Sequence, residues 1–146
     1  RMVTVLVEAA AGSREKHAFH QETLEHLGFG ETLLTYPYPY GFITGTLTPE
    51  GDCVDCYLIT DHSYTPGELV ECEPVGLLEF FEESEKDHKV LATLPGEAPV
   101  IDETLRLGLE RFIYGIFKKY PEMNVRVGEL RSASEAFDFI KGARPS

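Results

Sequence analysis

Hydrophobic and polar residues alternate in short runs over most of the chain, a pattern typical of β-strands with one buried face. Segments rich in glycine, proline or charge separate these runs. One run, 68–81, contains Pro74 and Gly76 and is expected to break there, because proline cannot donate to a sheet ladder. Residues 20–30 are expected to be irregular or a weak hairpin. The pattern predicts strands at residues 2–7, 16–19, 54–60, 68–81, 89–94 and 125–130.

The hydrophobic period changes near the end of the chain. Residues 102–120 carry apolar side chains three and four positions apart, which predicts an amphipathic helix that begins after Asp102 as N-cap and stops before Pro121. A second helix is predicted at 132–140, with a capping box formed by Ser132 and Glu135. Many short strands followed by helices indicate a mainly β fold. We expect a small closed five-stranded OB-like barrel, with one or two C-terminal α-helices packed outside it.

Length and charge narrow the class of protein. The chain has 146 residues, which is most simply one domain, 1–146. Its net charge is −12, so a nucleic-acid partner is not expected. No Lys or Arg occurs between Lys16 and Lys86. Such an acidic block is either a solvated surface or a region where bound divalent cations supply the missing positive charge.

Other sequence features bear on location and redox state. No apolar run approaches the roughly 20 residues that span a membrane, and no basic-then-apolar leader is seen. Three cysteines are an odd number, which fits a reducing cytoplasm. Cys53-x-x-Cys56 leads into a strand, whereas a thioredoxin-like motif opens a helix, and zinc would need more soft ligands. We therefore expect buried thiols and no disulfide between Cys53 and Cys56.

Acidic residues gather at one turn that feeds a predicted strand. Glu50, Asp52 and Asp55 lie in and just after the turn at 49–52, which proline and glycine mark. Acids grouped at the end of a strand repel one another unless something positive lies between them. Their hard oxygen atoms suit Mg²⁺, Mn²⁺ or Ca²⁺. The turn is therefore a candidate metal site.

The same stretch resembles the signature of the soluble family I inorganic pyrophosphatases, D-G-D-P-x-D. Residues 50–55 read EGDCVD, and residues 36–43 read YPYPYGFI where the family has Y-P-x-N-Y-G-F-I. Further similarity occurs at 8–16, at 75–78 and at 82–89, in the same order as in the family. The match runs from about residue 3 to 94, with a weaker tail through Lys118. We interpret the chain as a divergent member of this family.

The resemblance implies Mg²⁺-dependent hydrolysis of inorganic pyrophosphate to phosphate, with Mn²⁺ as an alternative ion and a homo-oligomeric assembly. Asp52 would accept a proton from the attacking water, and Tyr40, Lys16 and Lys89 would join it as catalytic residues. The residues expected to bind the phosphoryl oxygens are Lys16, Tyr40, Lys89 and Lys118. The expected metal ligands are Asp52, Asp55, Asp87, Glu50, Glu82 and Glu8.

Three departures from the family pattern leave alternatives open. Gly28 stands where the family has an arginine, Ala18 where it has a glutamate, and Phe117 where it has a tyrosine. An arginine that binds phosphate with two parallel hydrogen bonds is hard to imitate. The predicted site thus lacks some of the family's phosphate-binding side chains, whereas it keeps most of the predicted metal ligands. One alternative is a catalytically weakened metal- or phosphate-binding module, and another is a hydrolase of a different diphosphate.

Overall fold

The computed structural model describes residues 1–144. Most elements are short strands, and the two longer helices follow β8 in the chain. In this part of the chain no helix is long and apolar enough to cross a membrane. The elements are β1 Val3–Ala9, β2 Glu15–Phe19, β3 His26–Glu31, β4 Tyr40–Ile43, β5 Asp55–Leu58, β6 Leu69–Glu82, β7 Glu85–Lys86, β8 Lys89–Thr93, α1 Glu103–Ile116, the 3₁₀ helix η1 Pro121–Met123, β9 Val125–Arg131 and α2 Ala133–Gly142.

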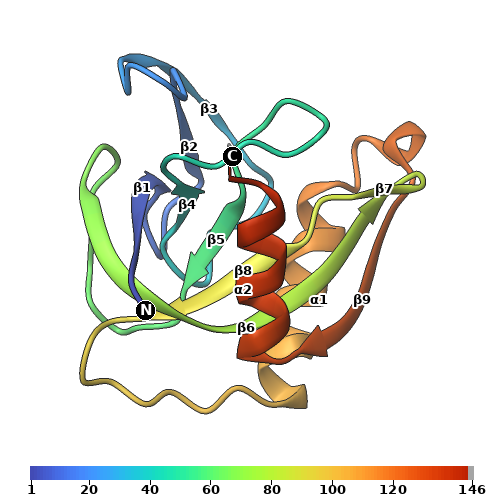
Figure 1. The fold of residues 1–146 in the computed structure, drawn as a ribbon. Coiled ribbons are helices and arrows are strands. Elements are labelled where there is room, and N and C mark those ends of the chain that lie inside the picture. The colour runs from blue at the N-terminus through green and yellow to red at the C-terminus, as the bar shows by residue number, and fades with distance from the viewer. Residues whose placement is uncertain (145–146) are drawn as a thin grey trace.

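Five strands form a closed ring, which confirms the predicted barrel. The neighbours run in the order β1, β4, β5, β8 and β6, and a further pairing of β6 with β1 closes the ring. All of these pairings are antiparallel except that of β5 with β8. The long, curved β6 extends beyond the ring, where it pairs with β7 and β9 (Figure 1).

All five barrel strands contribute to one buried cluster, which therefore marks the barrel interior. It contains Val5 of β1, Ile43 of β4 and Val90 of β8, together with Cys56 and Leu58 of β5 and Cys72 and Leu77 of β6. Helix α2 lies across the strands (Figure 1) and adds Ala136 and Ile140 to this cluster. The predicted N-cap of α2 is confirmed, since the Ser132 Oγ accepts a hydrogen bond from the Glu135 amide at 3.1 Å.

The opposite faces of the strands are covered by other elements. Helix α1 packs its buried Leu109, Phe112 and Ile113 onto a second cluster. The β2–β3 hairpin covers a third, smaller cluster around Phe42. Because side chains alternate across a strand, each barrel strand presents one set of residues to the interior and the other set to these outer layers. The candidate active site lies in the layer between the barrel and α1.

Several boundaries differ from the sequence-based prediction. β6 is one continuous strand, and the expected break is instead a register shift against β8 between Pro74 and Gly76. Strand β4 was not predicted because it follows two prolines. It lies close against β1, since a Cβ at Gly41 would collide with the Leu6 carbonyl oxygen. Helix α1 begins after Asp102 as predicted but ends at Ile116, before the expected residue 120.

Candidate active site

The parallel pairing of β5 and β8 brings three predicted residues to one place. Cys56 is in register with Val90, so Asp55, the first residue of β5, lies beside Lys89, the first residue of β8. Asp87 precedes Lys89 by two positions. Asp55 and Lys89 alternate with the interior residues Cys56 and Val90, so their side chains point outward toward α1. Residues 32 positions apart in the chain, Asp55 and Asp87, thereby share one cationic neighbour.

The Lys89 ammonium joins the two carboxylates. Its Nζ lies 2.6 Å from Asp55 Oδ2 and 2.9 Å from Asp87 Oδ2. Burial of the lysine opposes its charged form, but the two carboxylates outweigh burial and raise the pKa of Lys89 above its ordinary value. Burial also raises the pKa of Asp87, and Lys89 offsets part of that shift. Lys89 therefore stays protonated, and its ammonium group holds one carboxylate oxygen of Asp55 and one of Asp87 close together.

These groups line a cavity of about 290 Å³ beneath α1. One wall is polar, and it combines Lys16 with the Asp55, Asp87 and Lys89 network. The apolar lining comes mainly from α1 and the residue after it, through Ile113, Ile116 and Phe117. Phe80 of β6 also lines the cavity, and its ring lies against the Lys89 ammonium, 4.8 Å from Nζ to the ring centroid. The cavity therefore offers cations, carboxylates and a hydrophobic surface.

Three tyrosines form the floor of the cavity. The ring of Tyr40 lies 4.7 Å from that of Tyr57 and 5.5 Å from that of Tyr36, measured between centroids. All three are buried, and burial raises the pKa of each phenol above its usual range. The hydroxyls therefore stay protonated and can donate hydrogen bonds to an anion. Tyr40 was predicted in this role, whereas Tyr57 lacks a distinctive motif and was missed.

Glu8 and Lys16 add a second, looser ion pair at the edge of the network. The Lys16 Nζ is 3.9 Å from Glu8 Oε2, and the glutamate is buried while the lysine is largely exposed. Burial raises the pKa of Glu8 to about 7, although Lys16 acts in the opposite direction. Glu8 thus changes its charge near neutral pH, which is unusual for a carboxyl group.

The remaining predicted residues, Asp52 among them, are not part of the cavity lining. Asp52 is exposed, but its charge contributes to the raised pKa of Asp87. Glu50, Glu82 and Lys118 do not line the cavity either, and Glu50 instead lines a separate cavity next to α2. Within residues 1–144 no three or more His, Cys, Asp or Glu side chains are gathered as a ready-made metal cluster. The assignment of these acids as metal ligands stays a prediction.

The structure also locates the departures from the family pattern. Phe117 lines the cavity, and so does Tyr120 three residues later, which supplies a hydroxyl near the place where a tyrosine was expected. Gly28 is on β3 with a φ of +124°, a backbone conformation that side chains rarely adopt. Arg14 donates from Nε to the Thr32 carbonyl at 2.9 Å, and Thr32 lines the cavity. An arginine therefore lies beside the cavity wall, although not at the expected position.

All three cysteines are free and buried, which confirms that Cys53 and Cys56 form no disulfide. Cys56 points into the barrel with Cys72, whereas Cys53 belongs to the cluster beneath the β2–β3 hairpin. The expectation of buried thiols is confirmed for all three residues. Their role in the described part of the chain is packing.

Comparison with known proteins agrees with this geometry. The family described as inorganic pyrophosphatase matches residues 5–144. The chain belongs to the inorganic pyrophosphatase family. This confirms the family and the enzyme class, inorganic diphosphatase, that the sequence motifs predicted. Members of this family generally use divalent metal ions.

Individual relatives show how far the similarity extends. An inorganic pyrophosphatase of Nanoarchaeum equitans is 31% identical, over 97% of this chain and 95% of the relative. One from Sulfolobus acidocaldarius is 32% identical, over 96% of this chain and 88% of the relative. A third, from a Nostoc species, is 35% identical, but that match spans only 67% of this chain and 59% of the relative.

Solved structures share the fold. The crystal structure of an inorganic phosphatase from Anaplasma phagocytophilum has a TM-score of 0.84 at 25% identity, over 97% of this chain and 91% of that one. An inorganic pyrophosphatase from Neisseria gonorrhoeae gives a TM-score of 0.86 at 22% identity, over 97% of this chain and 88% of that one. The OB-like barrel with its outer helices is thus the fold of these proteins.

Proposed function

We propose that the protein hydrolyses inorganic pyrophosphate to two phosphate ions, with Mg²⁺ as the cation and Mn²⁺ as a substitute. The observation that carries this proposal is the cavity wall in which Lys89 bridges Asp55 and Asp87, with Lys16 and Tyr40 beside it. Positive and acidic groups are both needed there, because the substrate is a polyanion and its counter-cations need oxygen ligands.

The residues fit a divalent cation. Asp55 and Asp87 already direct oxygen atoms to a common positive centre within 3 Å, the Lys89 ammonium, and Asp52 lies within electrostatic reach. We assign Asp52, Asp55 and Asp87 as the main ligands, with Glu50, Glu82 and Glu8 as outer ones. A bound divalent cation supplies charge neutralisation and a water of lowered pKa.

Side chains of the protein carry out proton transfer and bind the phosphoryl oxygens. Asp52 accepts a proton from the water that attacks one phosphorus atom, and the bridging P–O bond breaks so that its oxygen leaves with the second phosphate. Lys16 and Lys89 attract the phosphoryl oxygens as point charges, and the protonated Tyr40 donates a hydrogen bond to one of them. Lys118, at the end of α1, adds a more distant charge.

A phosphate-release assay with pyrophosphate and excess Mg²⁺ or Mn²⁺ tests the proposal. Asp52→Asn should lower the rate by about 100-fold or more, because it removes the general base. Asp61→Asn is the matched control, since this exposed aspartate lies against a different cavity. Absence of phosphate release from the wild type with either ion would refute the proposed reaction.

The apolar wall favours one alternative, a hydrolase of a diphosphate that carries an organic group. Ile113, Ile116 and Phe117 could contact such a group but offer nothing to pyrophosphate itself. Phe117→Tyr discriminates between the two substrates. It should raise the rate with pyrophosphate if the missing hydroxyl limits turnover. Gly28→Arg is a poor companion test, because its positive φ would strain any side chain.

Two further expectations remain predictions. The assignment to a homo-oligomer follows from the family resemblance, and sedimentation of the purified protein would measure it. The cytoplasmic location rests on the sequence features given above. A binding module without turnover would retain affinity for Mn²⁺ and phosphate while releasing no phosphate from pyrophosphate.

A further inference from the structure

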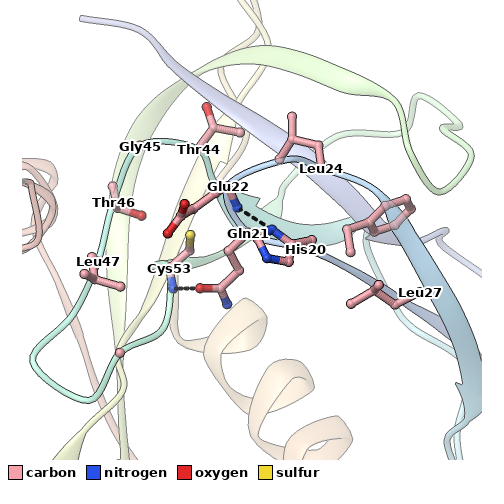
Figure 2. A pocket seen from close by; sticks show the side chains of 12 residues that line it. His20, Gln21, Glu22, Leu24, Leu27, Thr44, Gly45, Thr46, Leu47 and Cys53 are labelled. Atoms are coloured by element: carbon pink, nitrogen blue, oxygen red, sulfur yellow. Dashed lines mark hydrogen bonds between the residues drawn. The ribbon is translucent and has the colours of Figure 1, made fainter.

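The turn of the β2–β3 hairpin contacts the loop that carries Asp52. Figure 2 shows the two segments facing each other across a cavity of about 730 Å³, which is separate from the candidate active site. The Gln21 side chain crosses between them, and its Oε1 accepts a hydrogen bond from the Cys53 amide at 3.2 Å (Figure 2). This contact joins residues 32 positions apart.

The Cys53 amide belongs to the same peptide unit as the Asp52 carbonyl. That carbonyl accepts a hydrogen bond from the Thr48 amide at 2.7 Å. Because a peptide unit is planar, hydrogen bonds at both of its ends fix the ψ angle of Asp52. The ψ angle sets the orientation of this peptide unit relative to the Asp52 Cα atom and its side chain. Gln21 therefore helps to orient Asp52, an exposed residue with no side-chain hydrogen bond of its own among those found in residues 1–144.

Gln21 is itself held by its surroundings. The ring Nδ1 of His20 accepts a hydrogen bond from the Glu22 amide at 3.2 Å (Figure 2) and another from the Thr23 amide at 3.1 Å, and the two bonds fix the turn. Leu24 has a φ of +63°, an uncommon conformation for this residue, and packs with Phe19 against the cluster that contains Cys53. The turn is thus a rigid support rather than a loose tip.

The hairpin also carries Lys16, which lines the candidate active site from β2. One element therefore holds both a phosphate-binding lysine and an anchor of the Asp52 loop. We propose that Gln21 is a positioning residue that orients Asp52 for cation binding and proton transfer. This inference rests on the proposed function for its role in the reaction.

The test compares two substitutions of Gln21. Gln21→Met keeps the length of the side chain but removes the acceptor, and Gln21→Glu retains an acceptor oxygen. Glu22→Gln is the control, since its side chain lines the same cavity but makes no side-chain hydrogen bond within the described chain. Thermal unfolding first checks that all variants are folded.

Mn²⁺ affinity, measured by calorimetry without substrate, should fall about five- to tenfold in Gln21→Met, as expected for the loss of one orienting hydrogen bond. It should stay within about twofold of wild type in Gln21→Glu and in the control. Hydrogen exchange of the Cys53 amide should be faster only in Gln21→Met, because that amide loses its acceptor. Rescue by glutamate separates positioning from general destabilisation.

The outcomes separate this inference from the proposed reaction. If the wild type releases no phosphate but Gln21→Met still weakens Mn²⁺ binding and speeds exchange, the reaction fails and the positioning role stands. If the wild type is active while Gln21→Met matches it in Mn²⁺ affinity and Cys53 exchange, the positioning role is wrong. A wild-type protein that binds no Mn²⁺ overturns the inference together with the metal site.

Discussion

Glu8 provides a direct test of the electrostatics of the site. Its pKa is raised from 4.5 to about 7, mainly because the carboxyl group is buried. A raised pKa means that the folded state favours the protonated form, so this group adds stability below pH 4.5, and that stability is lost as pH rises through 7. One pKa unit corresponds to about 1.36 kcal/mol, so the ionised carboxylate costs about 3 kcal/mol at pH 8 and about 1 kcal/mol at pH 5.

Glu8→Gln removes the ionisation while keeping the shape of the side chain. The variant should therefore exceed the wild type in free energy of unfolding by about 3 kcal/mol at pH 8, and this advantage should shrink to about 1 kcal/mol at pH 5. Loss of the long contact with Lys16 should matter little, since that lysine is largely exposed and the pair is 3.9 Å apart.

Urea unfolding at pH 5, 6, 7 and 8, at constant ionic strength and with a chelator present, measures the difference. Glu31→Gln is the control, because Glu31 is exposed on β3 and its side chain makes no ion pair or hydrogen bond within residues 1–144. A stability difference between Glu8→Gln and wild type that does not change with pH would refute the reasoning, since it would mean that Glu8 ionises normally.

Two further predictions concern the bridging lysine and the start of α1. Lys89→Met should lower the free energy of unfolding by about 3–5 kcal/mol at pH 8, because it leaves two partly buried carboxylates without their shared cation. The loss should be smaller at pH 5 than at pH 8, because burial raises the pKa of Asp87 and so favours its protonated form as pH falls. Urea unfolding measures both values, and a loss below about 1 kcal/mol would contradict the bridging role. Asp102→Ala should cost about 1 kcal/mol through loss of the N-cap bond to the Leu105 amide, with Asp61→Ala as the unaffected control in the same assay.

The sequence alone determined those features that depend on short-range pattern. Alternation predicted four of the five barrel strands, all except β4, and helical spacing with capping residues predicted both helices, including Asp102 and Ser132 as N-caps. The motif at 50–55, with its companions, was sufficient to indicate the family and to propose which carboxylates and lysines form the site. These signals come from residues close together in the chain, so they can be recognised without knowing which strands pair.

Only the tertiary structure decided which of these residues meet. The register of parallel β5 and β8 places Lys89 between Asp55 and Asp87. A local sequence pattern does not reveal which strands pair or in what register. The same holds for Tyr57, which reaches the cavity only because β5 lies beside β4, and for Gln21, whose acceptor meets the Cys53 amide across 32 residues. Contacts between distant segments depend on how the barrel closes, and closure is a property of all five strands together.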